Sequence, residues 1–323
     1  MTDHAQSRAD LDGTQPPTGG ARALLNGQWI DADRLTVPVT DAGFMLGATV
    51  AEQLRTFGGE LFRLDAHLER LGRSLSIVGV DPGFSRDELA DQARQLVANN
   101  HALLAEGDDL GLSIFVTPGP YATFAPPGEP IVALHTYHLP FRLWARKYDV
   151  GQTLRTVSIR QVPDECWPAE LKCRSRMHYF LADREAAAAE PGARAVLLDL
   201  AGHVTESSTA NVIVVGGDGR LISPPRSAIL PGISLDTVLD TARQLGLDTS
   251  QSPITPDELY KASEVLLTST SSCILPVTTI DGATIGDGRP GPVFRRLMDA
   301  WSRRVGVDIT QQATRIAAGC RAC

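Results

Sequence analysis

Three groups of residues in the second half of the chain could together carry out chemistry on an amine. The sequence has only three lysines, Lys147, Lys172 and Lys261. Lys172 is followed by the acidic residue Glu206 and then by the segment 230–234, which reads Leu-Pro-Gly-Ile-Ser. A lysine amine can condense with an aldehyde, and burial or neighbouring cations lower its pKa enough to make it a nucleophile and a base. Lys172 is the candidate for that amine.

The carboxylate and the glycine-containing segment supply what a phosphorylated pyridine ring requires. A nearby carboxylate such as Glu206 favours the protonated ring nitrogen, typically by about 1 to 3 pKa units, and a protonated ring is the better electron sink. Residues 234–245 predict a helix, because their apolar side chains share one stripe, formed by Leu235, Val238, Leu239, Ala242 and Leu245. Gly232, Ile233 and Ser234 would then lie at its N-terminus, where free amides and the helix dipole attract phosphate. The sequence therefore predicts a site for pyridoxal 5'-phosphate.

Further segments match a known family in both order and spacing. They comprise Asp41-Ala42-Gly43-Phe44 with Gly47 and Glu52, residues 62–71, the Lys172 segment, residues 206–211, residues 230–234, residues 264–270 and Ile280-Asp281-Gly282. With these segments the sequence resembles the class IV, or fold-type IV, pyridoxal phosphate enzymes, from about residue 26 to about residue 304. This group includes branched-chain aminotransferases, D-amino-acid aminotransferases, R-selective amine transaminases and aminodeoxychorismate lyases.

The resemblance implies roles for individual residues. Lys172 corresponds to the Schiff-base lysine and Glu206 to the partner of the pyridine nitrogen. The phosphate contacts implied by the family are Arg70, the amides of Ile233 and Ser234, and Thr270. The resemblance also implies a two-domain α/β fold, with a small N-terminal α/β domain and a larger C-terminal domain built on a barrel-like sheet, and a homodimer. Asp65 could cap the helix that carries Arg70.

Several positions depart from the family pattern. Ala51 stands where most members carry an aromatic residue, so we expect a wider substrate pocket there. Pro118 to Ala125 lacks the arginine and histidine that hold a carboxylate in D-amino-acid aminotransferases, which disfavours D-amino acids. Met177 occupies the position of the branched-chain enzymes' tyrosine, and Arg176 or Tyr179 could replace that tyrosine at the cofactor's phenolic oxygen.

The activity we expect is transamination between an amino acid or primary amine and a 2-oxo acid. Candidate substrate contacts are Ala51, Arg55, Arg142 and Ser271, with Arg146 as a further arginine; ordinary surface charge is the more common explanation for each arginine. A lyase on the same scaffold and a catalytically silent paralogue that binds the cofactor are the alternatives. The identity of the amino donor is not determined by the sequence.

Composition is that of an ordinary globular chain of 323 residues with a formal net charge of −8. Nucleic-acid or membrane-surface binders are expected to be basic, so neither partner is predicted. We expect a cytoplasmic enzyme with no metal site. Five cysteines form no even framework, and a C-x-x-C site formed by Cys320 and Cys323 is not expected to be ordered.

The expected organisation follows from local patterns. Residues 1–21 are predicted to be a disordered leader, residues 22–141 the small domain, residues 142–152 a connector, residues 153–309 the large domain and residues 310–323 a tail. Asn26-Gly27 predicts a hairpin, Ser85 to Glu88 a capping box, and Pro292 the start of an amphipathic helix. We also expect Lys172 to lie in a helix.

Overall fold

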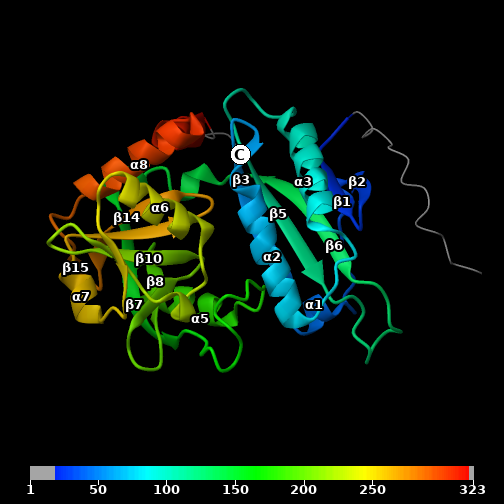
Figure 1. The fold of residues 1–323 in the computed structure, drawn as a ribbon, viewed down its shortest axis with the longest axis horizontal. Coiled ribbons are helices and arrows are strands. Elements are labelled where there is room, and N and C mark those ends of the chain that lie inside the picture. The colour runs from blue at the N-terminus through cyan, green and yellow to red at the C-terminus, as the bar shows by residue number, and fades with distance from the viewer. Residues whose placement is uncertain (1–18, 320–323) are drawn as a thin grey trace, which may run out of the picture.

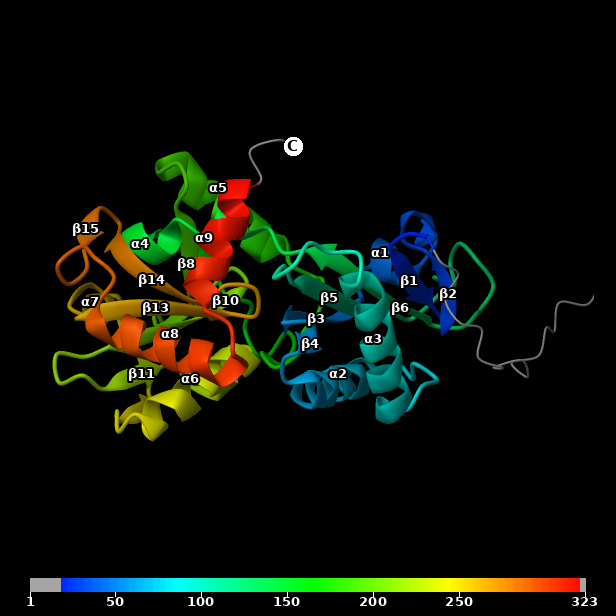
Figure 2. The same cartoon turned by 90° about the horizontal axis from the view of Figure 1, so that it is seen from above.

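Two separate β-sheets, each with its own apolar core, organise the chain into two lobes (Figures 1 and 2). The computed structural model describes residues 19–319. Its strands are β1 Arg22–Leu25, β2 Gln28–Asp31, β3 Val50–Phe57, β4 Glu60–Leu61, β5 Leu110–Thr117, β6 Ile131–His138, β7 Gln152–Arg160, β8 Arg194–Leu198, β9 Val204–Ser207, β10 Ala210–Val215, β11 Leu221–Ser223, β12 Thr249–Gln251, β13 Glu264–Ser269, β14 Cys273–Ile280 and β15 Ala283–Thr284. Its helices are α1 Ala42–Met45, α2 Leu64–Val78, α3 Arg86–His101, α4 Lys147–Val150, α5 Met177–Ala189, α6 Ile233–Gln244, α7 Pro256–Tyr260, α8 Pro292–Val305 and α9 Ile309–Gly319, with short 3-10 turns at Ala32–Arg34, Phe141–Leu143 and Arg226–Ala228.

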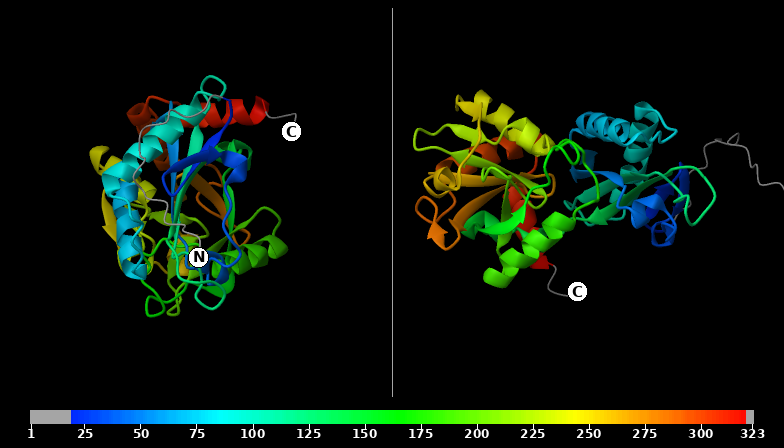
Figure 3. Two further views of the ribbon diagram at one scale, coloured as in Figure 1. Left: turned by 90° about the vertical axis from the view of Figure 1, so that its right-hand side faces the viewer. Right: turned by 90° about the horizontal axis from the view of Figure 1, so that it is seen from below.

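The small lobe is an antiparallel sheet in the order β2-β1-β6-β5-β3-β4. Asn26 and Gly27 both have positive φ at the β1–β2 turn, which confirms the predicted hairpin. The capping box of Ser85 and Glu88 opens α3 as predicted. The helices α2 and α3 pack their leucine-rich faces against one side of the sheet, and Figure 3 shows them from the small-lobe side. The other face of the sheet carries the partly exposed rings of Phe115, His135 and Tyr137.

The large lobe contains a closed barrel. Its strands follow the order β10-β13-β14-β7-β8-β9, and β9 pairs back with β10, so the ring has no free edge. The strands β11, β12 and β15 extend this sheet beyond the ring. Helices α6 and α8 pack on the barrel through buried apolar stripes that were visible in the sequence. The predicted α/β fold with a small lobe and a barrel-like sheet is confirmed.

The chain between the two sheets contributes to the core of the large lobe. Phe141, Trp144 and Tyr148 are buried there, and the Tyr148 hydroxyl donates a hydrogen bond to the Ser272 carbonyl oxygen at 2.8 Å. This segment is thus anchored to the β13–β14 turn, close to the region described below.

Three local predictions are wrong. Residues 310–319 form part of α9 instead of a tail, because Gln312 accepts a hydrogen bond from Arg55 at 3.0 Å and donates one to Asp109 at 2.7 Å. Asp65 does not cap α2, since the helix begins one residue earlier, after Arg63, which has a φ of 56°. Lys172 precedes α5 and lies in extended chain. The predicted leader lies largely outside the described residues, as do Cys320 and Cys323.

Among residues 19–319, no helix combines the length and the apolar character needed to span a membrane.

Candidate active site

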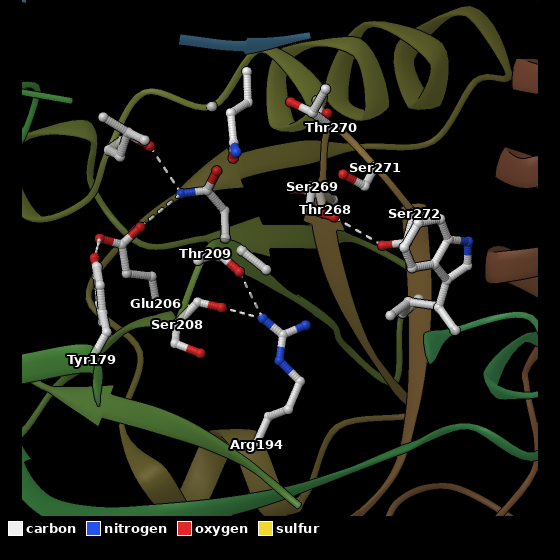
Figure 4. Close-up of a pocket in the computed structure, with 18 of the residues that line it drawn as sticks. Tyr179, Arg194, Glu206, Ser208, Thr209, Thr268, Ser269, Thr270, Ser271 and Ser272 are labelled. Atoms are coloured by element: carbon white, nitrogen blue, oxygen red, sulfur yellow. Dashed lines mark hydrogen bonds between the residues drawn. The ribbon is translucent and has the colours of Figure 1, made fainter. Parts of the chain in front are cut away.

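A cavity of about 450 Å³ lies between the lobes and collects most of the residues predicted from the sequence. Its lining includes Lys172, Glu206, Arg70, Ile233, Ser234, Thr270 and Ser271. Figure 4 shows Glu206 with Tyr179 on one side of this cavity and Thr270 with Ser271 on another. Residues separated by about 200 positions in the sequence therefore face one space.

Lys172 reaches the cavity from an extended segment that adds to the edge of β3. The Ala51 amide donates to the Lys172 carbonyl oxygen at 3.0 Å, and the Arg174 amide donates to the Thr49 carbonyl oxygen at 2.8 Å. The Lys172 amide itself donates to Ser74 Oγ at 3.1 Å, which fixes the residue against α2. The segment around Lys172 is therefore extended and not helical, and its backbone is held by β3 on one side and by α2 on the other.

The Lys172 amine is buried among cations. Burial lowers its pKa to about 7, Glu52 opposes this effect, and the guanidinium groups of Arg176, Arg70 and Arg174 lower the pKa further. A substantial fraction of the amine is therefore unprotonated at neutral pH, which is the form that can act as a nucleophile or base.

Glu206 lies in a tight hairpin formed by β9 and β10. Its partner across the hairpin is Asn211, and Thr209 in the turn has a φ of 63°. The Glu206 carboxylate accepts hydrogen bonds from the Tyr179 hydroxyl at 2.6 Å, from Gln161 Nε2 at 2.8 Å and from Asn211 Nδ2 at 3.3 Å. Burial raises its pKa to about 7 despite these donors. A neighbouring cation would stabilise the ionised form.

The N-terminus of α6 forms a cradle next to this hairpin. Gly232 is the N-cap and has no side chain to bond the first amides of the helix. A Cβ at Gly232 would lie 2.0 Å from Asn211 Oδ1, so only glycine allows the hairpin and the helix to approach so closely. Asn211 Nδ2 also donates to the Leu230 carbonyl oxygen at 2.9 Å. The amides of Ile233 and Ser234 are thereby presented to the cavity, as an anion would require.

Arg70 is held beside this cradle by a buried carboxylate. Its Nε and Nη2 atoms donate to the two oxygens of Glu52 at 2.7 and 2.8 Å, and Nη1 donates to the Pro231 carbonyl oxygen at 2.8 Å. His67 Nδ1 lies 2.8 Å from Glu52. Although burial alone would raise it, the pKa of Glu52 is strongly lowered by Arg70 and His67. Glu52 thus orients the guanidinium and leaves it further N–H donors for a ligand.

Four of the five candidate substrate contacts do not line the cavity. Ala51 is 1% exposed and packed inside the sheet. Arg55 is also 1% exposed, donates to the Ser271 carbonyl oxygen at 2.8 Å and stacks over the Phe57 ring at 4.1 Å, so its role is to join β3 to the large lobe. Arg142 and Arg146 are exposed and lie outside the described lining. Of the substrate candidates, only Ser271 faces the cavity.

The residues considered in place of the family's tyrosine differ in their contacts. Met177 is 68% exposed at the start of α5, and Tyr179 is committed to Glu206. Arg176 lines the cavity, and its Nε donates to the Cys173 carbonyl oxygen at 3.2 Å. Arg176 is therefore the available group of the two that were considered.

Sequence reasoning missed Gln161 and Arg194. Gln161 bonds Glu206 from 45 residues away, and Arg194 donates to the Ser208 carbonyl oxygen and to Thr209 Oγ1 on the cavity floor (Figure 4). No local pattern marks either residue, because only the barrel pairing brings them to the hairpin.

Comparison with known proteins identifies the family of the chain. A family model described as amino-transferase class IV matches residues 49–280. The chain is 32% identical to a D-alanine aminotransferase from Bacillus licheniformis over 281 residues, which cover 86% of this chain and 95% of that protein. It is 28% identical to a branched-chain-amino-acid aminotransferase from Salmonella typhimurium over 288 residues, with 86% and 90% covered.

Solved structures give the same result. The structure of a branched-chain amino acid aminotransferase from Escherichia coli superposes with a TM-score of 0.81 at 25% identity, covering 88% of this chain and 94% of that one. A branched-chain enzyme from a T.th. strain, solved with N-(5'-phosphopyridoxyl)-L-glutamate, gives a TM-score of 0.78 at 25% identity, with 89% and 95% covered.

Fold and cavity together define an enzyme in which an amine, a carboxylate and a helix N-terminus face one space. The chain belongs to the class IV aminotransferases, and its activity is transamination with pyridoxal phosphate as cofactor. The buried amine of Lys172, the Glu206 carboxyl and the amides beginning α6 fit that cofactor.

Proposed function

We propose that Lys172 is the residue that bonds the cofactor, and that the enzyme moves an amino group from an amino acid or primary amine to a 2-oxo acid. The observation that carries this assignment is the amine of Lys172, which has a pKa of about 7 and faces the same cavity as Glu206 and the start of α6. Lys261 instead pairs with Asp257 at the surface.

Bound pyridoxal phosphate supplies an aldehyde that takes up amino groups and a ring that accepts the electrons left by proton removal. The unprotonated amine of Lys172 would be the base that takes the proton from the substrate α-carbon and later returns it. The low pKa of Lys172 suits both directions of that transfer near neutral pH.

In this proposal the other residues of the site each contact a different part of the cofactor. Glu206 stabilises the protonated ring nitrogen, and its bonds from Tyr179 and Gln161 keep the carboxylate in place. The amides of Ile233 and Ser234, the Arg70 guanidinium and Thr270 would hold the phosphate. Arg176 replaces the family's tyrosine at the phenolic oxygen.

A donor and acceptor panel tests the activity. Purified enzyme incubated with amino acids and primary amines should turn over only when a 2-oxo acid is present, because transamination needs an acceptor. Turnover of a donor without any acceptor would favour the lyase alternative, and no reaction with any donor would favour a silent paralogue. Lys172→Ala should abolish turnover while the protein stays folded by circular dichroism.

We also propose that two copies of the chain form a homodimer. Two groups of exposed apolar side chains support this, one of Phe44, Met45 and Leu46, the other of Met177, Phe180 and Leu181. The segments that carry them are joined by a hydrogen bond from Ser175 Oγ to the Gly47 carbonyl oxygen at 2.7 Å. Exposed apolar patches of this kind mark interaction surfaces. Light scattering on the eluting protein should give twice the chain mass of 34.6 kDa.

A cytoplasmic location completes the proposal. The thiols of Cys166, Cys173 and Cys273 are free, which is compatible with reducing conditions. Cell fractionation would test it.

A further inference from the structure

Gln53 on β3 lines the cavity from the side of the small lobe. Side chains alternate between the two faces of a strand, so Ala51, Gln53 and Arg55 share one face of β3. Leu54 on the opposite face belongs to the core that the sheet shares with α2 and α3. Because Arg55 bonds the large lobe at Ser271, the face that carries Gln53 is turned toward the large lobe.

The neighbours of Gln53 on this face place it between Lys172 and the β13–β14 turn. In the pairing of β3 with the Lys172 segment, Lys172 is opposite Ala51, two residues before Gln53. Two residues after Gln53, Arg55 donates to the Ser271 carbonyl oxygen at 2.8 Å. Residues that are diagonal to each other across paired strands lie about 7 to 8 Å apart, within reach of long side chains. The Gln53 amide can therefore reach a ligand held at the Lys172 amine, since both side chains line the same cavity.

The Gln53 side chain is not used by the fold. Within residues 19–319 neither of its amide atoms takes part in a hydrogen bond, and the side chain is partly exposed. Its register partner on β5, Ser113, is bonded by Arg174 Nη2 at 3.2 Å instead. A glutamine amide offers two N–H donors and one acceptor oxygen. Both donors are therefore available to a ligand in the cavity.

The charges near Lys172 favour a negatively charged group of that ligand. The Arg176 guanidinium lines the cavity, and within the described residues its side chain has one hydrogen bond, to the Cys173 carbonyl oxygen, and no ion pair. The acidic residues of the lining, Asp183 and Glu206, already accept hydrogen bonds from their own neighbours. A carboxylate held near Lys172 would thus meet a guanidinium that has no acidic partner, and the two free donors of Gln53.

We propose that Gln53 binds the carboxylate of the amino acid and 2-oxo acid substrates through its amide N–H groups, and so favours acids over the corresponding amines. This inference rests on the proposed transamination. It supplies a contact that Arg55 cannot give, because Ser271 and Gln312 hold the Arg55 guanidinium inside the protein.

Binding of unreactive ligands tests the inference without turnover. Gln53→Met keeps the length of the side chain and removes both donors. Calorimetry of the holoenzyme with 4-methylvalerate should therefore give a dissociation constant about 10- to 100-fold larger in this variant, the range expected for loss of a hydrogen bond to a charged group. Gln53→Glu should bind the acid more weakly still, because it places a like charge against the carboxylate.

Two controls separate the carboxylate from the rest of the ligand and from general effects on the protein. The neutral 4-methylvaleramide should bind Gln53→Glu within about threefold of the wild type, because the new carboxylate can accept hydrogen bonds from its amide group. Gln95→Met, on the exposed side of α3, is the matched control and should bind 4-methylvalerate like the wild type. Since the fold does not use the Gln53 amide, all three variants should unfold at the wild-type temperature.

Kinetics with a matched pair of donors gives the second readout. Gln53→Met should raise the KM for leucine by a similar factor and change kcat/KM for 3-methylbutylamine by a smaller one, because the amine lacks the carboxylate. An unchanged affinity for 4-methylvalerate in the Gln53 variants, equal losses with the acid and the neutral amide, or no binding of the acid to the wild type would overturn the role of Gln53. If no donor reacts in the wild type, the proposed transamination fails, and the calorimetric comparison still decides whether Gln53 binds acids.

Discussion

The pKa of Glu206 gives the apoprotein a dependence of stability on pH that can be measured. Burial raises this pKa from the ordinary 4.5 to about 7 in the folded protein. The folded protein therefore keeps the carboxyl protonated where the unfolded chain has already lost the proton. A group with a raised folded pKa contributes stability that is complete below the unfolded value and is lost as pH rises through the folded value.

The size of the effect follows from the difference between the two pKa values. A separation of about 2.5 pH units, at about 1.4 kcal/mol per unit, corresponds to a loss of about 3 kcal/mol between pH 4.5 and pH 7. Glu206→Gln cannot ionise and does not undergo this loss. The wild type should therefore lose about 3 kcal/mol relative to the variant over that interval.

Urea unfolding of the two apoproteins at a series of pH values and constant ionic strength would measure this difference. Both proteins contain the same other titrating groups, so their contributions cancel in the comparison. A difference in unfolding free energy that does not change with pH would refute the reasoning, because Glu206 would then ionise at its ordinary pKa. Adding pyridoxal phosphate should flatten the dependence, since a cationic ring lowers the pKa of the carboxyl.

Three further outcomes are expected. Borohydride reduction of the holoenzyme followed by peptide mapping should find the cofactor on Lys172, and attachment to another lysine would contradict its assignment. Arg70→Lys should weaken binding of pyridoxal phosphate, measured by equilibrium dialysis, but not that of unphosphorylated pyridoxal, because only the phosphate contacts Arg70 in the proposed site. Ala51→Phe should lower the unfolding free energy by about 1 to 3 kcal/mol through overpacking, and should reduce kcat/KM for small and bulky donors alike, because Ala51 is buried outside the cavity. A larger loss of kcat/KM with the bulky donor than with the small one would instead indicate that Ala51 lies at the pocket wall.

Much of the local structure was determined by short stretches of sequence. The Asn26-Gly27 turn, the Ser85 capping box and the stripes of α6 and α8 depend on neighbouring residues and on helical periodicity, so they could be predicted one segment at a time. The order of lysine, glutamate and glycine-capped helix likewise identified the residues that meet in the cavity.

Tertiary structure decided how each polar group is used. The sequence offered Arg55 as a substrate contact, but Ser271 and Gln312, more than 200 residues away, bind its guanidinium inside the protein. The same hydrogen bond holds Gln312 in α9, where the sequence predicted a tail. Lys172 was expected in a helix, and its pairing with β3 replaced that helix by extended chain.

The physical reason is the cost of leaving a charge or a hydrogen-bonding group buried without a partner. The residues that supply the missing partner are those that the fold brings close, regardless of their distance along the chain. The sequence by itself therefore determined which residue types the site needs and the local elements that present them. Only the closure of the barrel, with α5 packed on β7 and β8, decided that Glu206 is bonded by Tyr179 and Gln161.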